Sequence, residues 1–239
     1  MPERHVHPWN VTTAEARAIQ LRLAGLVSAK NEVSRPRLLA GVDISAPRFQ
    51  GRVRGTVVVL SYPELGVVEI GAVEQTVDFP YIPGLLSFRE APVCLAAVEN
   101  LAKQPDVFII DGQGIAHPRR LGLAAHLGLF FDKPTIGCAK SRLIGQFEEP
   151  PREKGRYNLL TDSPSTNRRV NCGRRAVNDE IIGAVLRTRA NVKPVFVSVG
   201  HKCLLEDAIK ITLACATRYR LPEPTRLAHQ LVSRLKLKI

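Results

Sequence analysis

The amino-acid sequence predicts an α/β protein in which a mixed β-sheet is flanked by helices. Three strand-like runs follow one another with only short turns between them, which indicates an antiparallel meander. A helical segment then separates the meander from another apolar run, and this connection is long enough for the run to lie parallel to an earlier strand. The chain has 239 residues, 45% hydrophobic and 23% charged, so we expect residues 1–239 to form a single domain.

The first part of the chain is expected to form one helix and the three strands of the meander. Thr12 or Thr13 can cap a helix, because apolar residues recur at helical spacing from Ala16 to Leu26. Proline and glycine residues then separate three apolar runs. We predict strands over residues 38–45, 52–61 and 69–79.

The rest of the chain alternates between helical and strand-like segments. Further helices are predicted over residues 92–101, 121–131, 204–219 and 225–237. Further strands are predicted over residues 107–111, 134–138, 181–187 and 195–199. Residues 148–178 are polar and contain prolines, so we expect an excursion from the core. Three antiparallel strands, a helix and then a parallel strand are typical of the start of a ribonuclease-H-like sheet, which is the fold that we predict.

The charge of the chain favours a polyanionic partner. Lys and Arg number 34 and Asp and Glu number 22, which gives a formal net charge of +12 and a pI near 9.9. Such an excess is typical of proteins that bind nucleic acid. A basic soluble protein without that function fits the composition equally well.

Cysteine usage and hydropathy indicate a reducing, non-membrane environment. The five cysteines are odd in number and show no C-x-x-C pair: Cys94, Cys138, Cys172, Cys203 and Cys215. We therefore expect reduced thiols rather than disulfides or a zinc site. No apolar run has the roughly 18 residues that a membrane span needs, and the N-terminus lacks the apolar core of a signal peptide. These features predict a cytoplasmic protein.

Two aspartates are candidates for a metal site. Aspartate is depleted from strands, yet Asp43 lies between Val42 and Ile44. Asp111 ends the apolar run 107–110, at the strand end where α/β sheets present ligand-binding groups. Taken singly, either residue is explained as a turn or capping residue. If the two strands are parallel neighbours, the carboxylates converge, and hard oxygen ligands of this kind suit magnesium.

Glu90 is a candidate for a third carboxylate. Ser87 and Glu90 also match the S-x-x-E capping box that starts a helix. With Ser87 as the cap, Pro92 would lie within the helix and remove a backbone hydrogen bond, whereas a helix that starts at Ala91 or Pro92 fits the preference of proline for early positions. We therefore predict the later start, which leaves Glu90 available to a metal.

Five segments of the chain are distinctive: GVDIS from Gly41, PYIPGLLSFRE from Pro80, DGQGIAHPRRLGLAAHLGL from Asp111, PTIGCAKSRL from Pro134 and YRLPEPTRLAH from Tyr219. In this order along the chain they resemble endonuclease V. The resemblance runs from about residue 37 to residue 230, and the second and third segments are far more distinctive than a short motif.

The resemblance implies a ribonuclease-H-like DNA repair nuclease that recognises deaminated adenine, the base hypoxanthine, and cuts the second phosphodiester bond 3′ to it. Carried over position by position, the metal ligands fall on Asp43, Glu90 and Asp111, and His229 takes a fourth catalytic position. Relatives carry either His or Asp there, and a histidine on an amphipathic helix can equally pack or face solvent. We expect one or two Mg²⁺ ions as the cofactor, with Mn²⁺ able to substitute, because such ions activate water and stabilise the leaving oxygen.

The resemblance also implies that Tyr81, in the proline-framed PYIP turn, is a wedge that fills the space left by the flipped nucleotide. A partly buried turn tyrosine is the alternative. Further candidates for DNA contact are pocket, turn and basic residues: Pro83, Gly84, Arg89, Gly112, His117, Arg119 and Lys140. The glycines can also be purely conformational, and a single surface cation is more often just solvated.

We expect the partner to be DNA containing deoxyinosine, bound by a monomer. Inosine-containing RNA is an alternative substrate, since the same residues would serve both reactions. A non-enzymatic alternative is a basic nucleic-acid-binding protein that has lost catalysis. The presence of Asp43, Glu90 and Asp111 argues against this alternative.

Overall fold

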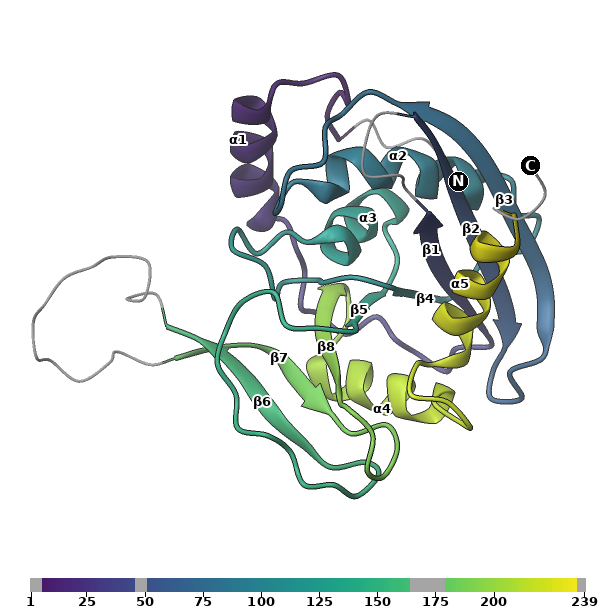
Figure 1. Cartoon of the computed structure of the whole chain (residues 1–239), viewed down its shortest axis with the longest axis vertical. Coiled ribbons are helices and arrows are strands. Elements are labelled where there is room, and N and C mark those ends of the chain that lie inside the picture. The colour runs from purple at the N-terminus through teal and green to yellow at the C-terminus, as the bar shows by residue number, and fades with distance from the viewer. Residues whose placement is uncertain (1–5, 46–50, 164–178, 236–239) are drawn as a thin grey trace, which may run out of the picture.

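The fold is built on an eight-stranded mixed sheet with the order β3-β2-β1-β4-β5-β8-β7-β6 (Figure 1). The computed structural model describes residues 6–45, 51–163 and 179–235. The strands are β1 (Leu38–Ser45), β2 (Gly51–Ser61), β3 (Val67–Val77), β4 (Val107–Ile110), β5 (Thr135–Ala139), β6 (Tyr157–Asp162), β7 (Glu180–Leu186) and β8 (Val195–His201). The predicted α/β class, with a mixed sheet flanked by helices, is confirmed.

The pairing of the strands follows from the lengths of their connections. Strands β1, β2 and β3, which follow one another closely in sequence, pair as the predicted antiparallel meander. The connection through a helix returns β4 parallel to β1, with Val42 opposite Ile110, and β5 is parallel to β4. Strands β4, β5 and β8 are buried along their whole length, which explains their apolar sequences.

Five helices lie in the described part of the chain: α1 (Thr13–Ala24), α2 (Leu86–Glu99), α3 (Leu123–Phe131), α4 (Leu205–Cys215) and α5 (Glu223–Leu235). Helix α1 starts at a capping box, in which Thr12 and Glu15 each accept a hydrogen bond from the backbone of the other. Of the two caps that the sequence allowed, the structure uses Thr12.

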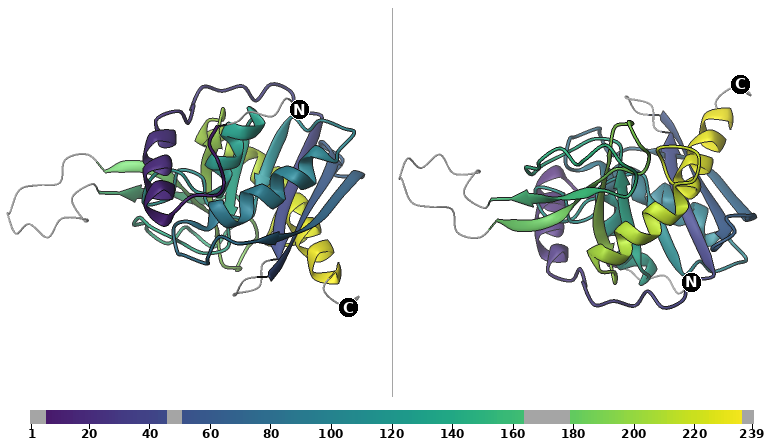
Figure 2. Two further views of the ribbon diagram at one scale, coloured as in Figure 1. Left: turned by 90° about the horizontal axis from the view of Figure 1, so that it is seen from above. Right: turned by 90° about the horizontal axis from the view of Figure 1, so that it is seen from below.

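The helices cover both faces of the sheet. Because side chains alternate along β1, Ala40 and Val42 pack with α2 and α3 on one face, whereas Leu39 belongs to the cluster that contains α4 on the other. Helix α5 packs beside β1 and β2. Helix α1 forms an outer layer, in which Ala16 contacts α2 and Leu23 contacts α3. Strands β6 and β7 project from this body as a hairpin arm (Figure 2).

Helix α2 starts earlier than predicted, at Leu86 rather than at Ala91 or Pro92. Pro92 lies inside the helix, where it cannot donate to the carbonyl one turn before it. The buried face of α2, which includes Phe88 and Ala91, outweighs this loss, since burial of one large apolar side chain contributes about 2 kcal/mol. Glu90 is therefore a residue of helix α2 rather than of the preceding loop, and its position relative to the sheet is set by the packing of the helix.

The expected excursion from the core also contains an element that the sequence did not reveal. Strand β6 pairs antiparallel with β7 along the edge of the sheet. Alternating exposure along its six residues gives it only one fully buried side chain, Leu160. A strand with so little apolar periodicity is hard to recognise from sequence.

The described cysteines are buried and form no disulfide with one another: Cys94, Cys138, Cys203 and Cys215. Cys172 lies outside the described residues. Among the described helices, none is long and apolar enough to cross a membrane.

Candidate active site

Three adjacent parallel strands end at the same edge of the sheet, and each brings a charged residue there. Asp43 lies near the end of β1, Asp111 directly follows β4, and Lys140 directly follows β5. The backbone N–H of Asp111 donates to the carbonyl of Val42 over 3.3 Å, so the parallel ladder continues to the aspartate itself. The two carboxylates therefore converge, as the sequence predicted for parallel neighbours.

Helix α5 completes this edge because it lies directly on the backbone of β1. A Cβ atom on Gly41 would stand only 2.0 Å from the carbonyl carbon of Pro224, so only glycine permits this approach. One turn further along α5, His229 Nδ1 lies 2.7 Å from Asp43 Oδ2. Ligand atoms of Asp43, Asp111 and His229 all lie within 4.8 Å of one another.

The charges at this edge are only partly balanced. Burial, reinforced by the negative charge of Asp111, raises the pKa of Asp43, while the hydrogen bond from His229 opposes this rise. Lys140 Nζ lies 2.5 Å from Asp111 Oδ2 and neutralises that carboxylate. The backbone at Lys140 is held by Arg220, whose Nη2 donates to its carbonyl over 2.6 Å.

Glu90 faces the two aspartates from α2 but lies outside the group of atoms within 4.8 Å. Burial is the largest cause that raises the pKa of Glu90 to about 7, and the charge of Asp43 adds to it. A carboxyl group in this state loses its proton readily when a cation arrives. The structure thus brings Asp43, Asp111 and His229 together and leaves Glu90 at the margin.

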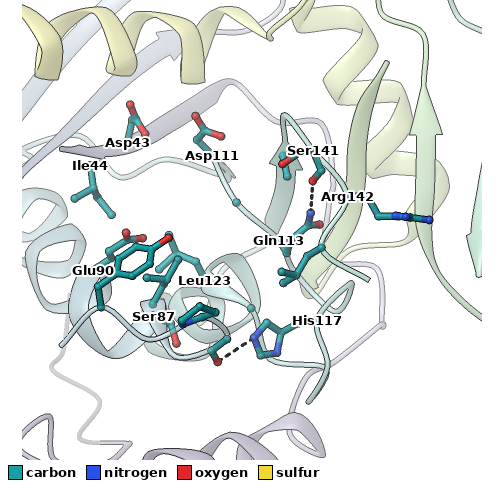
Figure 3. Close-up of a pocket in the computed structure, with 18 residues that line it drawn as sticks. Asp43, Ile44, Ser87, Glu90, Asp111, Gln113, His117, Leu123, Ser141 and Arg142 are labelled. Carbon is teal, nitrogen blue, oxygen red and sulfur yellow. Dashed lines mark hydrogen bonds between the residues drawn. The ribbon is translucent and has the colours of Figure 1, made fainter. Parts of the chain in front are cut away.

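A cavity of about 420 Å³ opens beside these carboxylates (Figure 3). Asp43, Asp111 and Glu90 line it together with the turn that carries Tyr81. Its volume is within the usual range for a site that holds one small molecule or nucleotide. Gln113 also lines the cavity, and its Nε2 donates to the carbonyl of Ser141 over 3.0 Å.

The turn that precedes α2 leaves its residues accessible beside the cavity. Tyr81 is 49% exposed and lies on the rim of the cavity, and Pro83 beside it is also exposed. Gly84 has φ +78°, a conformation that an L side chain rarely adopts, so this glycine has a conformational role whatever else it does. Gly112 also lines the cavity, but an added Cβ would make ordinary contact with Leu123.

Several residues that the sequence suggested for contact with DNA are already engaged within the protein. Arg89 is 1% exposed and donates to the carbonyl of Phe79 over 2.8 Å, so it is not a surface cation. His117 is 4% exposed, and burial is the main cause that lowers its pKa to about 4. Arg119 donates to the carbonyl of Gly84 over 2.6 Å. These three residues support the turn and the cavity wall in this structure, and Lys140 pairs with Asp111.

Two contributors to the site escaped the sequence analysis. Gln20 on α1 is 1% exposed and bonds to the carbonyl of Gly84 from a helix far away in sequence. A glutamine in an amphipathic helix gives no signal that separates it from a solvated residue. Arg220 lies within the YRLPEPTRLAH segment, whose resemblance to a family motif was the available signal.

The fold and the site together define a ribonuclease-H-like α/β protein whose adjacent parallel strands end in a carboxylate cluster. The chain belongs to the endonuclease V family, whose sequence model matches residues 21–230.

The similarity covers nearly the whole chain. An endonuclease V from Dehalococcoides mccartyi is 47% identical over 226 residues, which cover 95% of each chain. The crystal structure of an endonuclease V from Streptomyces avermitilis is 39% identical, has a TM-score of 0.84 and matches 96% of this chain and 95% of its own. The Ciona intestinalis endonuclease V, crystallised with a 24mer DNA containing an inosine followed by a ribo-adenosine, is 32% identical with a TM-score of 0.75, over 94% and 97% of the two chains.

Proposed function

We propose that this protein is a magnesium-dependent endonuclease that recognises hypoxanthine in DNA and hydrolyses the second phosphodiester bond 3′ to it. The observation that carries the proposal is the convergence of Asp43, Asp111 and His229 within 4.8 Å beside a cavity of about 420 Å³. Carboxylates serve as ligands for hard cations, and the cavity supplies room for a nucleotide.

The residues at the strand ends fit a magnesium ion. Asp43 and Asp111 offer hard oxygen atoms, and burial together with their mutual repulsion leaves negative charge that a cation would relieve. Glu90 would join them once it loses its proton. When bound, magnesium would activate water, neutralise the scissile phosphate and stabilise the leaving 3′ oxygen.

The side chains around the aspartates have separate tasks in this proposal. If Asp43 is ionised, it accepts the Nδ1 proton of His229, which leaves Nε2 able to bind a cation or accept a proton from water. Lys140 pairs with Asp111 and offers a positive charge to an approaching phosphate. Tyr81, exposed at the rim, would fill the gap in the base stack.

The specificity for hypoxanthine and the position of the cut rest on family membership. Hypoxanthine presents an oxygen acceptor and a ring N–H donor where adenine presents an amino donor and a ring acceptor, so a backbone N–H at Gly84 or Gly112 can favour hypoxanthine by donating to that oxygen. The inosine-containing DNA bound by the Ciona intestinalis relative supports this choice of substrate.

The experiment that tests the proposal is a nicking assay on end-labelled duplexes that differ in a single base, hypoxanthine or adenine, with magnesium or with EDTA. We expect a single cut, two phosphodiester bonds 3′ to hypoxanthine, only with magnesium. Asp43→Ala should abolish nicking while binding persists. Equal cutting of both duplexes, or full activity with Asp43→Ala, would refute the proposal.

A second candidate function is cleavage of inosine-containing RNA. The same relative was crystallised with a DNA that contains an inosine followed by a ribo-adenosine, which supports this candidate. An RNA strand of the same sequence, run beside the DNA duplex, decides between the two. Cutting of RNA at least about tenfold faster than DNA would assign RNA as the preferred substrate.

A further inference from the structure

The geometry points to Gln20, on helix α1, as a positioning residue that fixes the turn bearing Tyr81 and so sets damage recognition. The inference rests on the proposed function, in which Tyr81 enters the base stack. Gln20 does not line the cavity and lies outside residues 21–230, the part matched by the family. Any effect of Gln20 on nucleic acid must therefore pass through other residues.

The carbonyl oxygen of Gly84 is the point where Gln20 acts. Gln20 Nε2 donates to it over 3.0 Å, His117 Nε2 over 3.1 Å and Arg119 Nη2 over 2.6 Å. Figure 3 shows the bond from His117. A carbonyl oxygen has two lone pairs, so three donors on one oxygen mark a point that the fold holds from three sides.

The orientation of each donor is fixed by its other partner. Gln20 Nε2 also donates to the carbonyl of Leu121 over 3.2 Å, and Gln20 Oε1 accepts from Arg119 Nε over 2.5 Å. A flipped amide would set its oxygen against two carbonyl oxygens. His117 Nδ1 accepts from the N–H of Arg119 over 3.2 Å, so the ring proton is on Nε2, facing Gly84.

These bonds connect three parts of the chain that the sequence keeps apart. Gln20 belongs to α1, Gly84 ends the turn with Tyr81, and Leu121 closes the segment that starts at Asp111. Helix α1 is itself anchored in the core through Leu23, which is 1% exposed. The turn is thereby tied both to the core and to the strand end that carries a proposed metal ligand.

A wedge needs such a support. Unstacking a base pair costs a few kcal/mol, and a ring on a mobile turn would lose part of its binding energy to the ordering of that turn. Gly84, with φ +78°, contributes no side-chain packing of its own. The hydrogen bonds to its carbonyl therefore hold the turn at Gly84, in addition to the packing of Ile82 and Leu85, and Gln20 contributes the donor that comes from α1.

The first test measures the mobility of the turn in the free protein by hydrogen exchange. Gln20→Met keeps the length of the side chain and removes its hydrogen bonds. Leu23→Ala is the matched control, because it loosens α1 through packing and leaves the amide in place. We expect peptides covering residues 80–85 to exchange about tenfold faster in Gln20→Met than in Leu23→Ala. Equal exchange in the two variants would overturn the inference.

The second test is a double-mutant cycle between Gln20→Met and Tyr81→Ala, read as the ratio of affinities for hypoxanthine-containing and undamaged duplex without magnesium. If Gln20 acts through the turn, Gln20→Met lowers this ratio about tenfold in the parent protein and leaves it unchanged in the Tyr81→Ala background. An equal fall in both backgrounds would contradict the inference, since a general loss of stability does not depend on Tyr81.

The two tests separate this inference from the proposed function. If the parent protein shows no preference for hypoxanthine, the proposed specificity fails, and the role of Gln20 in damage recognition fails with it. The exchange experiment still decides whether Gln20 holds the turn, because it uses no nucleic acid. Faster exchange with an unchanged affinity ratio would refute the role in recognition while the proposed function stands.

Discussion

Two regions of the molecule differ in how the fold satisfies their polar groups. The carboxylate cluster consists of Asp43, Glu90 and Asp111. The Gly84 support consists of the Gly84 carbonyl and the three side chains that donate to it, which are Gln20, His117 and Arg119. At the cluster, burial and like charge raise the pKa values of Asp43 and Glu90, so the protein alone leaves negative charge unbalanced. At the support, the carbonyl of Gly84 has more donors than lone pairs. The first region keeps negative charge that the proposed metal ion would balance, whereas in the second the hydrogen-bonding capacity of the carbonyl is filled by the protein itself.

The largest expected effect on nicking is at Asp111, which follows strand β4, and not at Asp106, which precedes it. Asp111→Asn should lower the nicking rate by at least about a thousandfold, because a neutral amide is a poor partner for magnesium. Single-turnover nicking with saturating enzyme measures this loss.

Asp106→Asn is the matched control, since Asp106 precedes the same strand. Its Oδ2 accepts from the N–H groups of Arg37 and Leu38 over 2.7 and 2.9 Å, so the substitution should lower the free energy of unfolding by about 1 kcal/mol and leave nicking intact. Equal loss of nicking in both variants would show that Asp111 has no catalytic role beyond its effect on folding.

The next effect concerns Tyr81, which lies in the turn held by the Gly84 support. Tyr81→Ala should weaken binding to hypoxanthine-containing duplex by about tenfold to a hundredfold, because stacking of an aromatic side chain on a base contributes about 1–3 kcal/mol. Binding to undamaged duplex should change little, and Tyr81→Phe should behave like the parent protein. Fluorescence anisotropy with both duplexes measures the difference, and equal losses on the two DNAs would refute the wedge.

A further prediction tests whether the buried negative charge of the carboxylate cluster destabilises the metal-free protein. The folded pKa of Glu90, about 7, lies above its ordinary value of 4.5, so the ionised form is disfavoured by folding. The penalty is absent well below pH 4.5, grows between pH 4.5 and 7, and is complete above pH 7. Glu90→Gln should therefore stabilise the metal-free protein by about 3 kcal/mol at pH 8 but not at pH 4.

Urea unfolding of both proteins at the two pH values, in EDTA and then in magnesium, gives this comparison. Magnesium should remove the advantage of the glutamine at pH 8. An equal difference at both pH values would contradict the proposed charge imbalance.

The smallest effect tests the Gly84 support by lowering the pH, which protonates His117. The pKa of His117 is lowered from 6.5 to about 4, mainly by burial, so the neutral ring contributes stability that is lost as the pH falls from about 6.5 towards 4. His117→Gln keeps a donor for the carbonyl of Gly84 and does not titrate. We expect the variant to lose about 1 kcal/mol less stability between pH 7 and pH 5 than the parent protein. Parallel losses in thermal unfolding would contradict the assignment.

The sequence predicted the elements whose apolar pattern is strong, and through them the position of the cluster. Asp43 and Asp111 could be recognised because a carboxylate beside a buried strand is unusual, and the parallel pairing of β1 and β4 followed from the length of their connection. The start of α2 was predicted wrongly because the preference of Pro92 was weighed locally, whereas burial of the whole helix face decides the outcome.

The support could not be predicted, because its bonds join residues that no local pattern relates. Gln20 and Gly84 are far apart in sequence, and Arg119 and His117 resemble surface residues until the fold brings them to one carbonyl. Charge suggested contact with DNA for both residues, and the structure engages them within the protein. Hydrogen bonds between distant side chains and backbone depend on tertiary structure, which spacing alone does not encode.

The close approach of Pro224 to Gly41 has a consequence for the synthesis of the protein. His229 reaches Asp43 across 186 positions of the chain, and α5 is the last of the described elements to leave the ribosome. The set of proposed metal ligands is therefore complete only after α5 has been synthesised and lies on β1. In the proposed function, cutting would then wait until α5 has docked on β1.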